Sequence, residues 1–372
     1  MKPKKIQYEE ITNLKQLHPE LVVHDKIDLA IDELYDIAYP AQKDSKQQAD
    51  VDQFGEQLTS GKANRWGSWF YYPWINTLVH VPPVKEFRAL RTSRNRNLIT
   101  AEEQLKLYDA TILIVGMSVG SNVVEALVSQ GVGGKFILVD MDIIEPSNLN
   151  RIRSPYHHVG LHKVDAVSRK IWEIDPYIEV VGYMDGLNEE NIKLILEHNQ
   201  VDIIIDEMDE LRMKVILRQE AKNAKLPVIM AADDGDNALV DIERYDLEAS
   251  TPIFNGQIPE EIINRLLSDK IARAELGMII GRYFVGADNI PLRMYQSLAE
   301  VGKSLPSWPQ LGGAAALSGV TLTYVARKIL LGSKIKDGRA LVSLDEKLDL
   351  EHDDISVQEQ LQQFRSMIEG GK

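Results

Sequence analysis

The chain has 372 residues and 44% of them are hydrophobic, which is enough for one large α/β domain with an appendage, or for two domains. It contains no cysteine, so disulfides, thiolate zinc sites and thioester chemistry on the protein itself are excluded. Its 56 acidic and 42 basic side chains give a net charge of -14, which argues against nucleic acid as a partner, although a local basic patch could still bind tRNA.

The first 86 residues predict a small N-terminal α+β appendage. No apolar run reaches the roughly 18 residues of a membrane helix, and charged sequence follows the first residues, so we expect a cytoplasmic protein with no membrane segment. Apolar spacing predicts a helix over residues 27–39, whereas the charged residues 47–61 are typical of a linker or surface loop. Aromatic residues at 66–81 predict a strand pair with Pro73 at an edge, and we favour packing over substrate binding as their role.

Residues 87–107 are basic and helix-forming. Nine residues of this acidic protein contain four arginines: Arg88, Arg91, Arg94 and Arg96. They belong either to a solvated helix end that pairs with acidic neighbours or to an arm that binds an anion, and the residues leave both interpretations open. Thr100 and Glu103 have the spacing of a capping box, which predicts that a helix begins there.

A strand followed by a turn of small residues suggests a phosphate site. The apolar run at 111–115 predicts a buried parallel strand, and Gly116, Ser118 and Gly120 follow it directly, before a helix predicted at 123–130. Small residues let backbone N–H groups approach a phosphate at a helix N-terminus. Ser118 stands where a glycine is usual, so the turn departs from the common dinucleotide pattern.

Asp140 follows the next predicted strand, at 136–139, about twenty residues past the turn, where a carboxylate accepts hydrogen bonds from ribose hydroxyls. The alternation continues with predicted helices at 163–174, 189–197 and 211–224 and predicted strands at 178–183, 201–205 and 227–230. We therefore predict an α/β fold with an open, mostly parallel, Rossmann-like sheet and helices on both faces.

Several aspartates follow the ends of predicted strands: Asp140, Asp206, Asp209, Asp233 and Asp234. Carboxylates beside phosphates indicate a bridging hard cation such as Mg²⁺, which a hydride-transfer site does not need. For the last two of these residues we favour a turn with solvated aspartates. For His157, His158 and His162 we favour structural roles over metal binding, because no carboxylate stands at a ligand spacing.

The C-terminal third alternates less regularly. Pro259 precedes a helix predicted at 260–276. Residues 314–331 are rich in small and apolar side chains and predict a buried helix, expected at a subunit interface. The charged tail predicts a strand or loop and then a surface helix at 357–368. The predicted domains are the appendage (1–86), a nucleotide-binding domain (87–340) and the tail (341–372).

The pattern Asp140-x-Asp142-x-x-x-x-x-Asn148-x-x-Arg151, followed by Lys163 and by Asp206-x-x-Asp209, resembles the ThiF/MoeB-type, ubiquitin-activating-enzyme-like adenylyltransferases. The resemblance covers residues 94–232 and is specific in both residue type and spacing. It implies activation of a carboxylate by ATP and Mg²⁺: the carboxylate attacks the α-phosphate, and an acyl-adenylate and pyrophosphate are formed.

The resemblance also implies roles for individual residues. Those that bind the nucleotide would be Gly116, Ser118, Gly120, Asp140, Asp142 and Asn148. Those that act in the reaction would be Arg96, Arg151, Lys163 and Asp209, with Asp209 and Asp206 at the metal. Arg96 resembles an arginine finger given to the neighbouring subunit, so the resemblance implies a homodimer. Such a clamp suits phosphate-centred displacement, which needs charge neutralisation and in-line positioning.

The lack of cysteine departs from many members of this family, since both the zinc-binding cysteine pairs and the thioester cysteine are missing. We therefore expect no structural zinc and an adenylate that is released or captured by another nucleophile. The substrate is expected to be a carboxylate of a peptide, a small protein or a small molecule. Three alternatives stay open: an NAD- or FAD-dependent Rossmann oxidoreductase, a catalytically silent ThiF-like binding subunit, and activation of a modified tRNA base, which the acidic balance disfavours.

Overall fold

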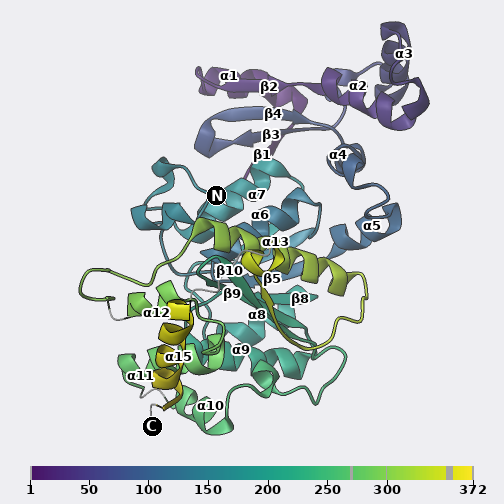
Figure 1. Cartoon of the computed structure of the whole chain (residues 1–372). Coiled ribbons are helices and arrows are strands. Elements are labelled where there is room, and N and C mark those ends of the chain that lie inside the picture. Colours follow the sequence, from purple (N-terminus) through teal and green to yellow (C-terminus); the bar gives the residue numbers. More distant parts are fainter. Residues whose placement is uncertain (1, 269–270, 299, 349–354, 371–372) are drawn as a thin grey trace. The chain divides into compact units, whose positions relative to one another are not determined.

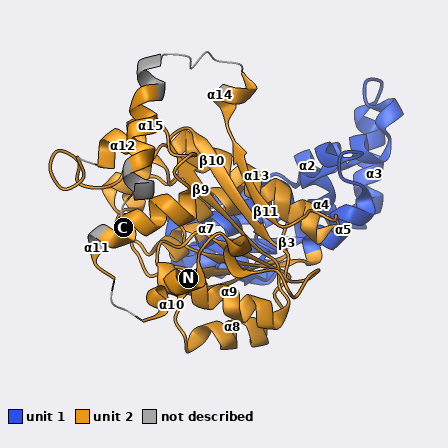
Figure 2. Ribbon diagram, turned by 60° about the horizontal axis from the view of Figure 1, so that its bottom comes forward, with its two compact units in different colours: residues 1–108, 128–131, 168–178 blue, residues 109–127, 132–167, 179–372 orange. Residues whose placement is uncertain are grey.

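The computed structural model describes residues 2–268, 271–298, 300–348 and 355–370. The chain forms two compact units, coloured separately in Figure 2. The first comprises Met1–Tyr108, Val128–Gly131 and Ser168–Ile178, and the second comprises Asp109–Leu127, Val132–Val167 and Glu179–Lys372. The first unit thus continues past residue 86, where the sequence predicted a domain boundary, and takes in short parts of later helices.

The first unit contains a four-stranded sheet in the order β1-β3-β4-β2. Its strands are β1 (Lys4–Ile6), β2 (Val22–Asp25), β3 (Ser68–Tyr72) and β4 (Thr77–Val81). β3 and β4 are antiparallel, which confirms the predicted strand pair, and the aromatic residues of β3 are buried. Pro73 is not at a strand edge as predicted: it begins the 3-10 helix Pro73–Ile75 between the strands, where its fixed φ suits the turn.

The helices of this unit are α1 (Ile11–Leu17), α2 (Ile27–Ala38), α3 (Gln48–Thr59), α4 (Val84–Arg91) and α5 (Ala101–Asp109). The loop predicted at residues 47–61 is wrong, because this segment forms α3. The Asp50 carboxylate accepts the Gln47 N–H at 3.1 Å and caps the helix start. Val51 is buried, and a side chain at Gly55 would lie 3.0 Å from Ile31 of α2. Close packing against one neighbour therefore stabilises a helix that has few apolar residues.

Two of the four clustered arginines have structural partners. Arg91 donates to the buried carboxylate of Asp175 at 2.7 Å, and the Arg88 guanidinium lies 4.3 Å from the centre of the Tyr108 ring. The predicted capping box is present as well, since Thr100 and Glu103 exchange hydrogen bonds at 2.8 and 3.2 Å. The interpretation of pairing with an acidic neighbour therefore holds for Arg91, whereas Arg88 packs on an aromatic ring.

The second unit is built on a seven-stranded sheet in the order β11-β10-β9-β8-β5-β6-β7. The strands are β5 (Thr111–Val115), β6 (Lys135–Val139), β7 (Glu179–Tyr183), β8 (Ile203–Asp206), β9 (Val228–Asp234), β10 (Asn237–Glu243) and β11 (Gly338–Val342). Neighbours from β9 to β7 are parallel, whereas β10 and β11 are antiparallel additions. The predicted open, mostly parallel sheet is confirmed, and β10, which the sequence analysis missed, extends it.

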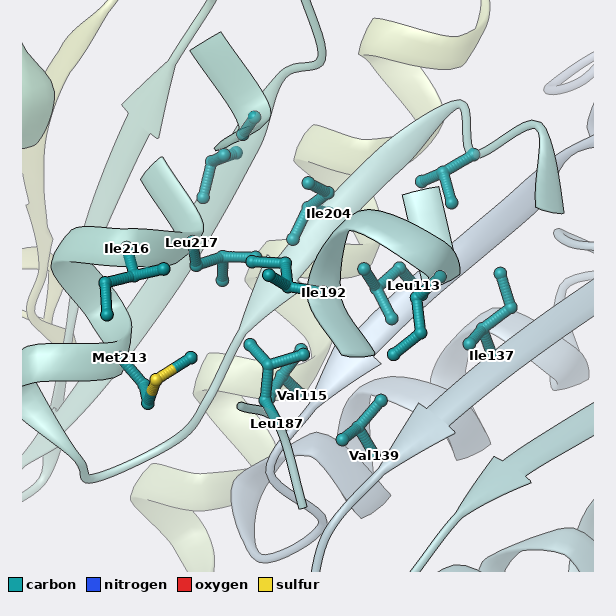
Figure 3. Close-up of a cluster of buried hydrophobic side chains, with 14 of the residues drawn as sticks. Leu113, Val115, Ile137, Val139, Leu187, Ile192, Ile204, Met213, Ile216 and Leu217 are labelled. Atoms are coloured by element: carbon teal, nitrogen blue, oxygen red, sulfur yellow. The ribbon is translucent and has the colours of Figure 1, made fainter. Parts of the chain in front are cut away.

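Helices cover both faces of this sheet. The parallel strands are connected by α6 (Val119–Ser129), α7 (Lys163–Ile174), α8 (Asn191–Asn199) and α9 (Leu211–Ala224). Figure 3 shows Leu113 of β5 and Ile137 of β6 on the face that packs against α8 and α9. The long buried helix α13 (Gly312–Leu330) lies on β9 and β10, as Figure 1 shows, and contacts α6 where Gly319 meets Asn122.

The segment between β10 and α13 forms a series of short helices outside the sheet. It contains α10 (Glu260–Leu267), α11 (Arg273–Ile279), the π-helix Ile280–Val285 and α12 (Leu292–Leu298). The single helix predicted at 260–276 is therefore wrong, since α10 ends at Leu267. The tail forms α14 (Leu344–Lys347) and α15 (Ile355–Gly370). None of the described helices is both long and apolar enough to cross a membrane.

Candidate functional site

The turn after β5 fits only glycine at its first position. Gly116 has φ +90°, and a side-chain carbon there would lie 2.3 Å from the Glu207 carbonyl oxygen. The turn therefore packs directly on the chain that follows β8. Helix α6 begins at Val119, so the first N–H groups of this helix lie just after the turn.

Asp140 fixes the conformation of this turn. One carboxylate oxygen accepts the Met117 N–H at 2.6 Å, and the other accepts the Asp142 N–H at 2.7 Å. Asp140 thus joins the turn after β5 to the loop after β6. Each oxygen has further acceptor capacity for a ligand hydroxyl, because a carboxylate oxygen can accept two hydrogen bonds.

Lys163 stands beside this carboxylate pair, at the start of α7. Its backbone N–H donates to the Asp142 carbonyl at 2.9 Å, and its ammonium donates to the Asp142 carboxylate at 2.7 Å. The Lys163 side chain is 9% exposed, whereas that of Asp142 is 62% exposed. The Lys163 ammonium is therefore largely buried, whereas the Asp142 carboxylate that binds it faces solvent. An anionic ligand could compete with this carboxylate for the ammonium.

Arg151 is held against the turn from a different direction. Its Nε donates to the Ser118 hydroxyl at 3.0 Å, and its carbonyl accepts from the Asn122 amide of α6 at 3.0 Å. The serine that replaces a glycine in the turn thus has a structural partner. Asn148, three residues before Arg151, is buried. Its side chain accepts the Glu145 N–H at 3.1 Å and so stabilises this loop.

A cavity of about 190 Å³ opens at this edge of the sheet. Six predicted site residues line it: Gly116, Ser118, Asp140, Asp142, Lys163 and Asp209. Leu187, Met208 and Met213 add an apolar wall. The cavity therefore joins a glycine turn, a cation and two strand-end carboxylates to a surface that can accept a flat ring.

Asp206 has a different environment from Asp209. It is fully buried, and its two oxygens pair with Lys214 at 3.1 Å and with Arg218 at 2.5 Å. Burial alone would raise the pKa of Asp206, but these two cations outweigh it and hold the pKa below its ordinary value. Asp209 is exposed in the cavity mouth. The two carboxylates, both predicted at the metal, are therefore not equivalent.

Asp206 also belongs to a longer buried network. Arg218 donates through Nε to Glu243 at 2.7 Å, and Glu243 accepts from Tyr245 at 2.6 Å. This network ties the end of β8 to the end of β10. Sequence reasoning missed it, because its members are spread over β8, α9, β10 and the turn after β10, and only tertiary contact brings them together.

Of three acidic side chains near the ends of β8 and β9, Glu207 and Asp234 are buried and Asp233 is partly buried. Glu207 accepts the Ala231 N–H at 2.9 Å, and burial raises its pKa well above the usual range. Burial, followed by the charge of Asp233, raises the pKa of Asp234 to about 7, and one of its oxygens has no partner among the described residues. Asp233 accepts from the Gln310 amide at 3.2 Å. The predicted turn is present at residues 235–236 and Asp236 is exposed, but the prediction of solvated aspartates is wrong for Asp234, which is buried in the packed β9–β10 hairpin.

Arg96 and the histidines are not among the residues that line this cavity. Arg96 is exposed and belongs to the first unit, just after the 3-10 helix Ser93–Asn95. His158 contacts the Ser154 hydroxyl at 3.0 Å. Within the described ranges, no group of three histidine or acidic side chains is arranged to hold a metal ion.

Comparison with known proteins supports the pattern read from the residues. The model of the ThiF family matches residues 92–240. An uncharacterised Mycobacterium tuberculosis protein, MT1398, is 35% identical over 316 residues, which are 80% of this chain and 42% of that protein. The tRNA threonylcarbamoyladenosine dehydratase of Bacillus subtilis is 32% identical over 139 residues, 37% of this chain and 54% of the enzyme. The chain thus spans about half the length of these relatives.

Among solved structures, Escherichia coli MccB with ATP is similar with a TM-score of 0.49 and 18% identity, over 71% of this chain and 76% of that one.

Proposed function

We propose, from the match of residues 92–240 to the model of the ThiF family, that the chain is an adenylyltransferase that uses ATP and Mg²⁺ to activate a carboxylate as an acyl-adenylate. The observation that carries the proposal is the single cavity lined by the Gly116 turn, Asp140, Lys163 and Asp209. A nicotinamide site would need no cation and no exposed carboxylate opposite the phosphates.

The nucleotide would lie across the carboxyl ends of β5, β6 and β8. Asp140 would hold the ribose hydroxyls with the acceptor capacity that Met117 and Asp142 leave free. The N–H groups at the start of α6 and the Lys163 ammonium would face the phosphates. Lys163 would exchange its bond to Asp142 for a bond to a phosphate oxygen, which is why that partner lies on the exposed side.

In the reaction, a carboxylate oxygen of the substrate forms a bond to the α-phosphorus. The bond from this phosphorus to the bridging oxygen of the β-phosphate breaks, and pyrophosphate leaves with the electron pair. Arg151 and Lys163 neutralise the charge that builds on the phosphate oxygens and hold the groups in line. No proton is required, because an ionised carboxylate is already the nucleophile.

Asp209 is the residue that fits a Mg²⁺ ion. Mg²⁺ is usually bound by one or two protein carboxylates together with phosphate oxygens and water, so one exposed aspartate at the cavity mouth suffices. When bound, the ion supplies positive charge to the phosphates. Asp206 is paired on both oxygens, so we assign it to the architecture of the loop and not to the metal.

We further propose a homodimer in which Arg96 of one subunit completes the site of the other. Its exposed position after a short 3-10 helix allows it to reach a neighbouring molecule. Because the chain has no cysteine, a nucleophile other than a cysteine thiol of this chain would capture the adenylate.

The test is the exchange of labelled pyrophosphate into ATP by purified protein, with candidate carboxylates and with Mg²⁺ varied. We expect exchange that falls by at least about a hundredfold in Arg151→Ala and Asp209→Asn, as is typical when a transition-state contact is removed. Arg153→Ala, two residues away and 60% exposed, is the matched control and should keep its activity. Tight NAD binding without ATP binding would refute the proposal.

The names of the relatives suggest which carboxylates to include. One relative is named for a modified tRNA nucleoside, and a Xenopus laevis protein that is 29% identical over 147 residues is named adenylyltransferase and sulfurtransferase MOCS3. The assay should therefore include bulk tRNA beside peptide and small-molecule acids. The net charge of -14 leads us to expect no exchange with tRNA.

A further inference from the structure

A second cavity opens beside the nucleotide cavity, and the two share Asp209 and Glu210. We propose that this second cavity binds the carbon chain of the carboxylate substrate, and that this chain is uncharged and aliphatic. The inference rests on the proposed adenylation. It goes further by stating the chemical class of the substrate and the residues that select it.

The lining of this cavity combines an aliphatic wall with three charged residues, Asp209, Glu210 and Arg212. It has a volume of about 340 Å³, within the usual range for small-molecule sites. Five of its eight lining residues are leucine or isoleucine: Leu211, Leu266, Ile271, Leu276 and Ile280. They come from the start of α9, the end of α10, the segment before α11, α11 itself and the first residue of the π-helix that follows it. An apolar group is the ligand that such walls stabilise, since burial removes both surfaces from water.

The cavity floor is rigid because it is the edge of a packed core. Leu211 and Leu266 are buried and belong to a cluster that includes Phe254 and Phe284. Ile280, in contrast, is 40% exposed at the rim. The site is therefore largely formed before a ligand enters, which lowers the entropy cost of binding.

The charges around the cavity determine the orientation of the ligand. Arg212, the basic residue in the wall, pairs with Glu189 and also donates to the Leu267 carbonyl. The cavity interior therefore offers no fixed cation to a carboxylate. At the shared mouth, Asp209 is the proposed Mg²⁺ ligand. The aliphatic chain would lie inside, and its carboxylate would lie at the mouth, facing the nucleotide.

A larger cavity in the same unit provides a comparison. It measures about 760 Å³, lies between the β9–β10 turn, α12 and α15, and has no lining residue in common with the nucleotide cavity. Its wall contains four charged residues beside Arg365: Asp236, Asp288, Arg293 and Glu346. Leu292 lines this cavity and is partly buried, so it can be substituted in the same way as a residue of the aliphatic cavity.

An aliphatic carboxylate can be a free acid or the C-terminus of a peptide, and paired probes separate these sources. The probes are octanoate against succinate, and Gly-Gly-Leu against Gly-Gly-Asp. Binding to the full chain is measured by calorimetry with saturating ATP and Mg²⁺, and pyrophosphate exchange is measured in parallel. We expect at least one aliphatic probe to bind about tenfold more tightly than its acidic counterpart, the discrimination typical of an apolar pocket.

Variants locate the bound chain. Ile280→Trp fills the rim without entering the core, and Leu276→Trp is a second filling variant should the first disturb folding. Each is expected to weaken binding of the aliphatic probe by about tenfold or more and to leave ATP binding unchanged. Leu292→Trp, which fills the larger cavity, should leave both unchanged.

The proposal is overturned if no aliphatic probe binds, if acidic probes bind equally well, or if only Leu292→Trp weakens binding. Its failure can be distinguished from failure of adenylation. Probe binding that depends on Ile280, with no exchange for any carboxylate, would support the pocket and contradict the enzymatic proposal. Pyrophosphate exchange that Ile280→Trp and Leu276→Trp leave unchanged would support adenylation and contradict the aliphatic pocket.

Discussion

Asp206 and Asp209 have the same chemistry and lie three residues apart, yet their environments predict opposite effects of substitution. Asp206→Asn removes a buried negative charge that pairs with both Lys214 and Arg218. Arg218 keeps Glu243, but the ammonium of Lys214 loses its carboxylate partner. Breaking a buried pair in this way costs about 3–5 kcal/mol of unfolding free energy. Asp209→Asn at the exposed cavity mouth should change it by less than about 0.5 kcal/mol.

The two variants are compared by urea denaturation at pH 7 and by the Mg²⁺ dependence of pyrophosphate exchange. Asp206→Asn should lower the denaturation midpoint strongly and, where it is folded, keep the wild-type Mg²⁺ requirement. Asp209→Asn should keep the midpoint and need much more Mg²⁺. Because the pKa of Asp206 is lowered in the folded state, its stabilising contribution is present above its unfolded pKa of about 3.9 and is lost as the pH falls through the folded value.

The reasoning is refuted if Asp206→Asn is as stable as the wild type, or if it shifts the Mg²⁺ requirement as Asp209→Asn does. Lys193→Met controls for general loss of a lysine in the same unit. Its pair with Glu220 is at 3.7 Å and the lysine is 63% exposed, so little loss of stability is expected.

Three further predictions follow from single contacts. Burial raises the pKa of Asp234 to about 7 in the folded state, against about 3.9 when unfolded, so its ionisation destabilises the fold increasingly as the pH rises between these values. Asp234→Asn should therefore raise the free energy of unfolding, measured by denaturation, by about 2–4 kcal/mol at pH 8 and by almost nothing at pH 4. An equal gain at both pH values would contradict this. Gly319→Ala places a carbon 2.8 Å from the Asn122 backbone and should lower the free energy of unfolding by about 1–3 kcal/mol. It should also reduce pyrophosphate exchange, because the Asn122 side chain donates to the Arg151 carbonyl; wild-type stability and exchange would argue against this. Inactive Arg96→Ala and Arg151→Ala proteins, when mixed, should recover about a quarter of wild-type exchange if the finger acts between subunits, whereas no recovery would exclude it.

Elements with strong local patterns could be predicted closely. Helix α9 and helix α7 begin and end at the predicted residues, and β5 matches the run at 111–115. In these segments, periodicity, caps and flanking turns all favour the same structure. The prediction failed at α3, whose few apolar residues gain their burial from α2, and at the end of α10, which stops at Leu267 before the polar residues 268–270.

The candidate site divides in the same way. The sequence alone placed Asp140 and Asp209 just past strand ends, and parallel strands bring their carboxyl ends to one edge of the sheet. It placed Arg151 after the strand that precedes Asp140, and Lys163 at the start of the following helix. It could also indicate that a small residue was needed at Gly116. Their roles in the reaction stay a prediction that rests on residue type, spacing and the family resemblance.

What the tertiary structure alone decided is the charge environment of each carboxylate and the shape of the space beside it. Asp206 and Asp209 read alike in sequence, but Lys214, Arg218 and Glu243 surround only the first. The aliphatic cavity is formed by residues up to 71 positions apart, between Asp209 and Ile280, with no shared motif. Burial and long-range pairing set pKa values and cavities, and neither is encoded in local periodicity.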